Sequence, residues 1–278
     1  MIQVLAVFCF HNRKRTTVAC VQSLLAQVGL GKEFSIQMLA VDDGSGDDSA
    51  RAIRSHVPEC EIIIADGSWY WARSMAHLYS QAQQRTFDYL LMINDDVLFA
   101  EEAMQNALTD LAQVPVGSVL VGKTCDPRTG QWSYGGQRYR RPAFPLWFVG
   151  GDPGEGLQPV HTLNANFVLI PKDVVQMVPF FGNYSHAFSD IDYGLHLTRA
   201  GIPLYQSSHY VGTCARNPQR GTWLDESLPF LTRLRLLNTR KGMPWRDRLR
   251  YARRNGGWAW MWFFVHPYVK FCWKALVH

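Results

Sequence analysis

The chain has 278 residues, enough for one large domain or two small ones, and its 47% hydrophobic content excludes disorder along its whole length. Its 28 basic and 23 acidic side chains give a formal charge of +5, which is too small to identify a partner by itself. Six scattered cysteines, without a C-x-x-C pair, speak against a zinc site or a disulfide framework and favour the reduced thiols of a cytosolic protein.

The first hundred residues alternate between apolar runs and helical patterns. The run 2–10 is typical of a buried parallel strand and not of a signal peptide, because no basic residue precedes it. Asn12 is a plausible N-cap for a helix that follows. The other expected elements are strands at 36–41, 61–65 and 89–93 and helices at 49–56, 72–84 and 101–113. This alternation predicts an α/β fold with a mostly parallel sheet between helices, where ligands bind outside the carboxyl ends of strands.

The pattern changes after Val119, where glycine, proline and aromatic residues predict short antiparallel strands and exposed loops that could recognise an acceptor. A strand at 167–170, a helix from Lys172, a helix at 191–200 and a strand at 203–206 would complete the core. We therefore divide the chain into two halves of one domain, 1–115 and 116–212, and a helical extension, 213–278.

The C-terminal extension is basic and aromatic. Its arginines crowd together at Arg246, Arg248, Arg250, Arg253 and Arg254. The aromatic run 258–273 is interrupted by His266, Pro267 and Lys270, and it falls short of the ~20 apolar residues of a spanning helix. We expect this segment to lie on a membrane surface and not to cross it, with a nucleic-acid patch as the minority interpretation.

Acidic clusters occur where expected strands end or helices begin. They are Asp42 with Asp43, Asn94 with Asp95 and Asp96, and Asp190 with Asp192. Any one cluster can be explained by helix capping or solvation. Their joint placement at the carboxyl ends of a parallel sheet favours a binding site, because buried carboxylates need partners, a cation or water. In an extended backbone Asn94 and Asp96 point to one side, so Asp96 assisted by Asn94 could hold a hard cation together with diphosphate oxygens.

Four segments resemble the inverting family-2 glycosyltransferases of GT-A fold, in the same order and with approximately the same spacing. They are VFCFHNR, VDDGSGDDS, INDDV and SDIDYGLHLTRAG. Further segments are similar to a bacterial, rhamnosyltransferase-like subgroup of surface polysaccharide assembly, as for O-antigen or capsule. They are GSWYWARSMAHLYSQA, LNANFVLIPKDV, YVGTCARNP and GTWLDESLP. The resemblance covers nearly the whole chain.

The resemblance implies roles for matching residues. Nucleotide binding is implied for His11, Asn12, Arg13, Asp42 and Asp43, and contact with the metal and diphosphate for Asn94, Asp95 and Asp96. His209 would approach the metal, a divalent cation such as Mn²⁺ or Mg²⁺, and Asp190 would be the catalytic base. Chemistry supports these roles, because a departing diphosphate needs a cation with Arg13 or Arg73 nearby, and an attacking hydroxyl needs a carboxylate.

Other interpretations of these residues stay open. Asp190 could only cap the helix that follows it, and His209 could be structural. Trp71 and its aromatic neighbours could line the donor pocket or only pack in the core. Two positions depart from the family pattern: Asn94 replaces the first aspartate of D-x-D, and Ala76 stands where the tryptophan-rich members usually carry asparagine.

These expectations combine into one function. The chain would transfer a sugar, with inversion, from a nucleoside-diphosphate donor to a growing, lipid-linked bacterial surface glycan. The expected location is the cytoplasmic, inner face of the plasma membrane, where the protein would be peripheral. dTDP-rhamnose is favoured as donor over a UDP-hexose or UDP-N-acetylhexosamine. An inactive sugar-nucleotide-binding protein is the alternative, whereas a nicotinamide-dependent oxidoreductase lacks support because the first strand runs into HNRKR without a G-x-G-x-x-G turn.

Overall fold

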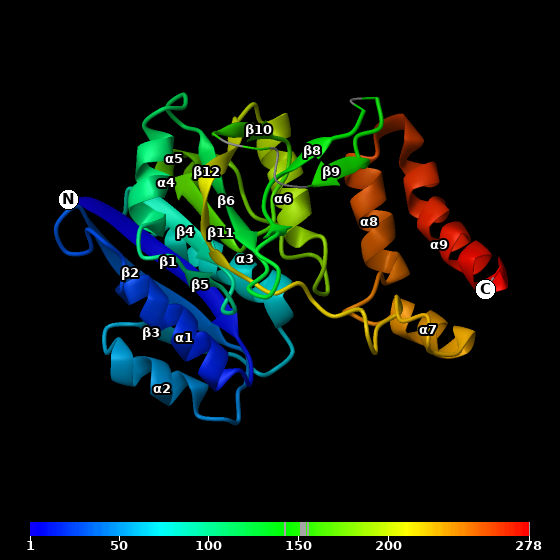
Figure 1. The fold of residues 1–278 in the computed structure, drawn as a ribbon, viewed down its shortest axis with the longest axis horizontal. Helices are drawn as coiled ribbons and strands as arrows, with labels where there is room; N and C mark the ends of the chain where they lie inside the picture. Colours follow the sequence, from blue (N-terminus) through cyan, green and yellow to red (C-terminus); the bar gives the residue numbers. More distant parts are fainter. Residues whose placement is uncertain (142, 151–153, 155, 278) are drawn as a thin grey trace.

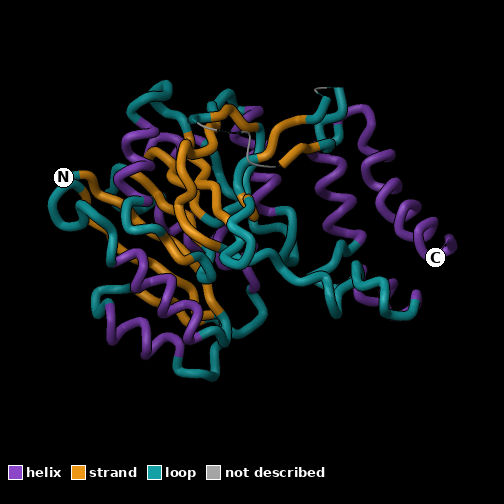
Figure 2. The backbone as a smooth tube through the Cα atoms, viewed as in Figure 1, coloured by secondary structure: helices purple, strands orange, loops and turns teal. Residues whose placement is uncertain are grey.

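The computed structural model describes residues 1–141, 143–150, 154 and 156–277. Within them a ten-stranded, mostly parallel sheet forms the centre of the molecule (Figures 1 and 2). Its parallel strands are β1 (Ile2–Phe10), β2 (Phe34–Asp42), β3 (Glu61–Ile64), β4 (Tyr89–Ile93), β6 (Val119–Cys125) and β12 (Leu204–Thr213). The antiparallel strands are β10 (Gln158–Val160) and β11 (Phe167–Pro171), with the short β5 (Leu98–Phe99) beside β12 and β7 (Trp132–Tyr134) beside β6.

The strand order brings distant segments to one edge of the sheet. Along its main path the order is β10-β12-β6-β11-β4-β1-β2-β3. Because β11 runs antiparallel to both β4 and β6, its amino-terminal end lies beside their carboxyl ends. Strands from 1–115 and from 116–212 therefore belong to the same sheet, and the residues that follow β1, β2, β4 and β12 gather with those that precede β11.

Helices cover both faces of the sheet. One face carries α1 (Lys14–Leu25), α2 (Ser49–His56) and α4 (Ala103–Leu111), and the other carries α3 (Tyr70–Ala82), α5 (Lys172–Met177) and α6 (Ser189–Arg199). Strand β1 explains the apolar run at the start of the chain, since Val4, Ala6 and Phe8 pack on the α1 side while Leu5 and Val7 pack on the α3 side. Each such large buried side chain contributes roughly 1.5–3 kcal/mol.

The C-terminal extension lies at one side of the domain, next to α6 and to the separate strand pair β8 (Gln137–Tyr139) and β9 (Phe148–Gly150) (Figure 1). It contains α7 (Phe230–Leu237), α8 (Trp245–Asn255), a 3₁₀ turn (Gly257–Ala259) and α9 (Trp260–Val277). Asp192 of α6 receives a hydrogen bond from Asn255 Nδ2 at 2.6 Å and pairs with Arg254 at 3.1 Å. Among the described helices, none has the length and apolar character needed to cross a membrane.

Several elements differ from the sequence expectation. Asn12 does not cap α1, because that helix begins at Lys14 with Arg13 in the capping position and Asn12 adopts a left-handed φ of 50°. Strand β6 was not expected, because its apolar start runs into Gly122 and Lys123. Glycine is needed there, since a Cβ on Gly122 would lie 2.8 Å from the Phe167 side chain. The short antiparallel strands expected after residue 119 are confirmed by β7 to β10.

Strand β12 is also longer than the expected strand at 203–206. The polar residues Ser207 and Ser208 resemble a strand end in the sequence, but each finds a partner inside the fold. Ser207 Oγ accepts a hydrogen bond from Lys123 N at 3.0 Å, and Ser208 donates to Asp110 of α4 from its backbone and its hydroxyl. The strand therefore continues to Thr213, which moves its end towards the edge where β4 also ends.

Candidate active site

The loops that follow β1 and β2 are linked by hydrogen bonds. Gly46 N donates to Asn12 Oδ1 at 2.8 Å, and Asn12 N donates to Ser45 Oγ at 2.9 Å. Ser45 N in turn donates to Asp42 Oδ1 at 2.8 Å, which gives this buried carboxylate a partner. Two of the residues implied to bind a nucleotide, Asn12 and Asp42, therefore lie in one connected loop pair.

Asp43 holds the start of α3. Its carboxylate accepts hydrogen bonds from Trp69 N at 3.1 Å and Tyr70 N at 2.7 Å, and its backbone carbonyl lies 2.6 Å from His11 Nδ1. Tyr70 has a left-handed φ of 54°, which is uncommon for an aromatic residue and is fixed here by the carboxylate. The aspartate thus joins β1, β2 and α3 at the edge of the sheet.

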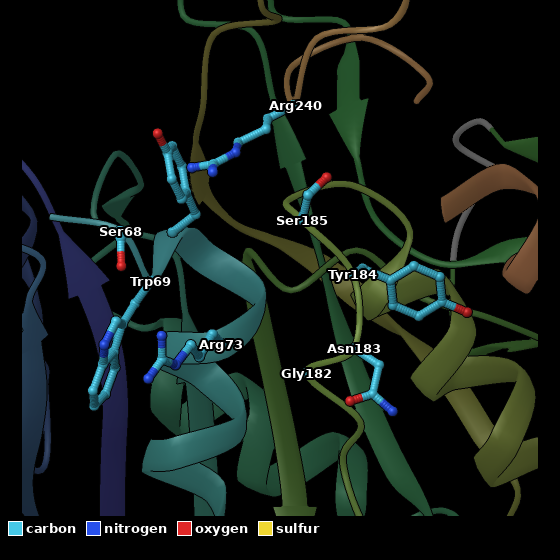
Figure 3. A pocket seen from close by; sticks show the side chains of 9 residues that line it. Ser68, Trp69, Arg73, Gly182, Asn183, Tyr184, Ser185 and Arg240 are labelled. Carbon is cyan, nitrogen blue, oxygen red and sulfur yellow. The ribbon is translucent and has the colours of Figure 1, made fainter. Parts of the chain in front are cut away.

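Arg73 and Trp71 diverge from the first turns of α3. The Arg73 guanidinium stacks 4.6 Å from the Trp69 ring and lines a cavity of about 320 Å³ opposite the loop 182–185 (Figure 3). Trp71 points the other way, and its Nε1 donates to Asn94 Oδ1 at 2.8 Å. The structure therefore brings Trp71, but not Arg73, into contact with the residues that follow β4.

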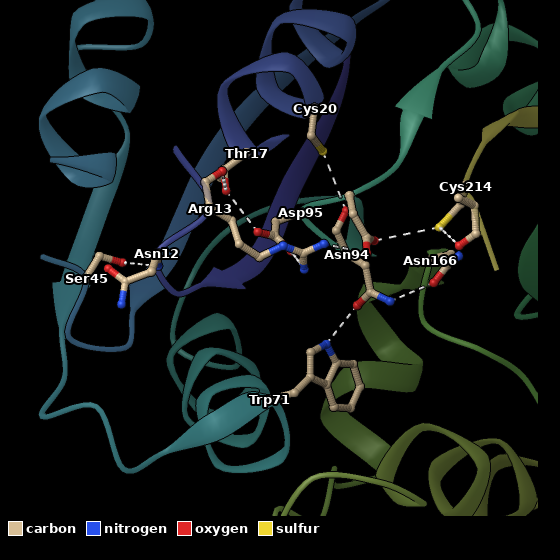
Figure 4. Close-up of polar contacts among 12 residues, drawn as sticks. Asn12, Arg13, Thr17, Cys20, Ser45, Trp71, Asn94, Asp95, Asn166 and Cys214 are labelled. Atoms are coloured by element: carbon tan, nitrogen blue, oxygen red, sulfur yellow. Dashed lines mark hydrogen bonds and ion pairs between the residues drawn. The ribbon is translucent and has the colours of Figure 1, made fainter. Parts of the chain in front are cut away.

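Arg13 forms ion pairs with both aspartates that follow β4, and Figure 4 labels Arg13 and Asp95. Its Nη1 lies 2.9 Å from Asp95 Oδ1 and its Nη2 lies 2.8 Å from Asp96 Oδ2. The contact forms because β1 and β4 are parallel neighbours, so their carboxyl ends lie side by side. The Arg13 side chain is still 45% exposed. Since a guanidinium has five N–H groups, donors remain for an anionic ligand.

Asp95 is the anchor of this cluster. Its side chain is only 7% exposed, and burial raises its pKa to about 6, although Arg13 and a hydrogen bond from Thr17 act in the opposite direction. The Thr17 hydroxyl lies 2.9 Å from Asp95 Oδ2. Thr17 is not among the predicted site residues, although its position one helical turn after Arg13, on the same face of α1, is a signal for it in the sequence.

Asn94 connects the cluster to the start of β11. Its Nδ2 donates to Asn166 Oδ1 at 2.6 Å, while its Oδ1 accepts from Trp71. Phe167 is opposite Ile93 in the antiparallel pair, so the residues beyond them meet at the sheet edge. An aspartate at position 94 has no N–H to donate. The asparagine that replaces the first aspartate of D-x-D therefore forms a hydrogen bond to Asn166 that an aspartate could not donate.

Asp190 lies in the first turn of α6, which begins at Ser189. Phe188 occupies the capping position and no side chain caps this helix, so Asp190 is not its N-cap. Its Oδ1 accepts from Ile191 N at 2.8 Å, and its Oδ2 accepts from Asn164 Nδ2 at 3.3 Å. Burial raises the pKa of Asp190 above the usual aspartate range, against the effect of these hydrogen bonds. A carboxylate with a raised pKa is a stronger proton acceptor.

Two asparagines connect Asp190 to the residues after β4. Asn164 and Asn166 are two positions apart in the segment that leads into β11, and they bind Asp190 and Asn94 respectively. The sequence segment LNANF contains this spacing. Its significance depends on β11 lying antiparallel between β4 and β6, which the sequence pattern does not predict. The short backbone segment between these two asparagines therefore links Asp190 to Asn94, which directly precedes Asp95 and Asp96.

Cys214, and not His209, lies beside Asp96. The Cys214 Sγ is 3.7 Å from Asp96 Oδ1, and burial together with Asp96 raises the pKa of this thiol to about 12, so it remains protonated. His209 is exposed on β12, five residues earlier, which in a strand corresponds to roughly 16 Å. Its neighbour Ser208 contacts Asp110, which lies in the last turn of α4. The implied metal role of His209 therefore has no support in this geometry.

Asp96 could hold a metal ion only together with a bound diphosphate. Across the described ranges, no group of three or more histidine, cysteine, aspartate or glutamate side chains could hold a metal ion. Asp96 Oδ2 is engaged by Arg13, and Asn94 is engaged at both ends of its amide. These residues fit a Mg²⁺-like ion that takes Asp96 as its protein ligand and completes its shell with diphosphate oxygens and water.

Solved glycosyltransferases share this fold. The mannosyltransferase PcManGT from Pyrobaculum calidifontis, solved with GDP-Man and Mn²⁺, matches with a TM-score of 0.54 and 14% identity, covering 91% of this chain and 64% of its own. The chain thus spans less than two thirds of that protein. Residues 1–349 of S. aureus TarS with UDP-GlcNAc match with a TM-score of 0.57 and 11% identity, covering 91% and 71%. At these identities the likeness establishes the GT-A fold alone.

Sequence comparison supplies the family. No curated protein matches the chain. The family model described as "Glycosyl transferase family 2" matches residues 6–159, which is more than half of the chain. This span contains the loops after β1 and β2 and the Arg13, Asp95 and Asp96 cluster. The chain therefore belongs to glycosyl transferase family 2.

Proposed function

We propose that this chain is an inverting glycosyltransferase that uses a nucleoside-diphosphate sugar as its donor. The observation that carries the proposal is the bridge of Asn164 and Asn166, which connects Asp190 to the residues next to Asp95 and Asp96. Sugar transfer from a diphosphate requires a proton acceptor and positive charge at the diphosphate, and Asp190 and Arg13, the latter aided by a cation on Asp96, would supply them at one edge of the sheet.

The donor would lie along the carboxyl edge of the sheet. The loops that contain His11, Asn12, Asp42 and Asp43 offer polar groups to the nucleoside, and Arg13 faces the diphosphate with its remaining N–H groups. Two structural relatives carry GDP-Man and UDP-GlcNAc, so nucleotide sugars are ligands that this fold accommodates. These relatives support the donor class without specifying the sugar of this chain.

The proposed reaction is a single displacement. The acceptor oxygen forms a bond to the anomeric carbon while the bond from that carbon to the diphosphate oxygen breaks, and the electron pair leaves with the diphosphate. Asp190 takes the proton of the acceptor hydroxyl, and Arg13 neutralises charge on the leaving group. Attack opposite to the leaving group inverts the anomeric configuration. A divalent cation, Mn²⁺ or Mg²⁺, held by Asp96 would supply further charge neutralisation when bound.

The acceptor we propose is a growing, lipid-linked glycan of a bacterial surface polysaccharide, of O-antigen or capsule type. The support is an apolar face on the extension, exposed to solvent and made of Trp258, Met261, Trp262, Val265, Val269 and Trp273. At about 100° per residue, the members within α9 occupy an arc of roughly 120°. Lys270 is exposed about 60° beyond one end of this arc, and Lys274 is exposed about 100° beyond the same end. Such a helix suits a peripheral position on an anionic membrane, here the cytoplasmic face.

The donor is tested by thermal-shift measurements with a panel of nucleotide sugars, each with and without Mn²⁺ or Mg²⁺. We expect dTDP-rhamnose to raise the melting temperature more than UDP-hexoses do, because a ligand that binds only the folded state stabilises it. A larger shift with UDP-glucose or UDP-N-acetylglucosamine would contradict dTDP-rhamnose as the donor and favour that UDP-sugar. No shift with any nucleotide sugar would contradict the proposed function, and binding without sugar transfer would favour an inactive binding protein.

A further inference from the structure

The cavity beside α3 is separate from the Arg13 cluster. Its volume is about 320 Å³, and we call it the arginine cavity. Its lining includes Trp69, Tyr70, Arg73 and Arg240, together with the loop 182–185. Figure 3 shows Arg73 on the start of α3, Arg240 approaching from the extension, and the loop 182–185 on the opposite wall. That loop runs directly into the helix that carries Asp190.

The two arginines of this cavity lack ion-pair partners among the described residues. Arg73 stacks on Trp69 at 4.6 Å, and Arg240 stacks on Tyr70 at 4.2 Å. Arg73 acts on the carboxylate of Asp66 only through longer-range attraction, and that carboxylate is fully exposed. Stacking fixes the planes of both guanidinium groups while their N–H edges remain available. Guanidinium groups held in this way are suited to bind phosphate.

Small residues keep the loop close to α3. A Cβ on Gly182 would lie 2.5 Å from Ala76 Cβ and 2.9 Å from the Ala72 carbonyl, so no larger side chain fits at position 182 without movement. Ala76 is the position where the tryptophan-rich family members usually carry asparagine. The departure therefore has a structural correlate, because a larger side chain at 76 would displace the loop that forms one wall of the arginine cavity.

A second cavity, of about 390 Å³, adjoins the first. Tyr70 and Arg240 belong to both linings, so the Tyr70–Arg240 stack is the wall between the two cavities. The lining of this second cavity also includes Trp223, Leu236 and Lys241 of the extension. A phosphate group bound by Arg240 would thus lie next to this second cavity, whose lining combines the apolar Trp223 and Leu236 with the positive Lys241.

We infer that the two cavities bind the acceptor through a lipid diphosphate, with the diphosphate at Arg73 and Arg240 and the first part of the apolar chain beside Trp223 and Leu236. This inference rests on the proposed function and adds to it the position of the acceptor. The extension would therefore form half of the acceptor site, in addition to any membrane contact. Arg73, which the sequence pattern places with the donor, serves the acceptor instead.

The test is calorimetric titration of the full chain carrying Arg13→Gln, so that the donor cluster contributes little diphosphate binding. Geranyl diphosphate should bind this protein, and adding Arg240→Gln should weaken binding roughly ten- to hundredfold, as expected for a lost charge-assisted hydrogen bond. Arg235→Gln is the matched control, since Arg235 is an exposed arginine of α7 outside both linings. It should leave the affinity unchanged.

Two comparisons make the outcome decisive. Inorganic pyrophosphate should bind at least tenfold more weakly than geranyl diphosphate, because it lacks the apolar chain, and geraniol alone should bind weakest. Equal affinity of the Arg240→Gln and Arg235→Gln proteins for geranyl diphosphate would overturn the inference. Equal affinity for pyrophosphate and geranyl diphosphate would overturn its lipid part. Nucleotide-sugar binding by the unmodified chain is measured separately, so failure of the proposed donor function is distinguishable.

Discussion

At the scale of single residues, the edge of the sheet explains which of the predicted site residues lie close together. The sequence places Arg13, Asp95 and Asp96 after strands, and parallel pairing of β1 with β4 brings them into contact. Cys214, and not the predicted His209, lies beside Asp96 because β12 continues beyond Ser207 and Ser208, whose polar side chains resemble a strand end in the sequence. These contacts join residues that are 82 to 118 positions apart in the chain, so local sequence patterns do not contain them.

Arg13 gives a residue-scale prediction. Arg13→Gln should weaken nucleoside-diphosphate affinity roughly ten- to hundredfold, because it removes the guanidinium that we propose contacts the diphosphate and leaves the buried Asp95 with Thr17 but without its ion-pair partner. Calorimetry with the nucleoside diphosphate of the best donor measures the effect. Arg15→Gln is the control, since Arg15 is exposed in the same helix, and equal affinities of the two variants would contradict the role of Arg13.

Asp96 gives a second prediction at this scale. Asp96→Asn should remove the gain in donor affinity that Mn²⁺ provides, because Asp96 is the protein ligand of the ion in the site that we propose. Asn94→Ala should reduce this gain less, although it also breaks the bridge to Asn166. Titration of the nucleotide sugar with and without saturating Mn²⁺ measures the gain. An unchanged gain in Asp96→Asn would show that Asp96 does not bind the ion.

At the scale of elements, α6 has two distinct faces. Asp190 faces the segment before β11, whereas Asp192, two residues later, turns towards the extension and is buried against Arg254 and Asn255. The sequence pattern predicts that the two carboxylates diverge, and the structure confirms it. The partner of Asp192 was not predictable, because it lies in a separate helix whose docking leaves no periodic signal in α6.

Asp192→Asn should therefore lower stability. The variant removes the charge that pairs with Arg254, and the loss should be about 1–3 kcal/mol because Arg254 remains partly solvated. Chemical denaturation measures it. Asp173→Asn, an exposed aspartate in the first turn of α5, should change stability by no more than about 0.5 kcal/mol. Similar losses in both variants would mean that the α6–α8 contact contributes little.

At the scale of the whole molecule, the extension packs against the half of the domain that contains Asp190. Helix α8 covers Asp192 and stacks Tyr251 on Phe188, just before Asp190, at a ring distance of 4.9 Å. Removing the extension would therefore disturb α6 as well as any membrane contact. The sequence predicts the aromatic and basic character of this segment, but not its packing against α6, because that packing uses single polar and aromatic contacts with no repeat.

The membrane contact is best tested with surface substitutions. Trp262→Ser combined with Trp273→Ser should reduce sedimentation with anionic liposomes more than tenfold, since each side chain contributes roughly 1.5–3 kcal/mol when buried in the interface. Met177→Ser changes an exposed apolar residue of α5 and should have no effect. Unchanged liposome binding by a folded double variant would contradict a membrane role for α9.

The central claim is that Asp190 is the base of a sugar transfer. The most direct measurement is the turnover of Asp190→Asn with its nucleotide sugar and acceptor, compared with Asp173→Asn and with nucleotide affinity measured in parallel. The substitution keeps the size of the side chain and removes the proton acceptor. We predict that turnover falls roughly 10²- to 10⁴-fold while nucleotide affinity and melting temperature stay near those of the unmodified chain. Turnover close to that of the unmodified chain would contradict the claim.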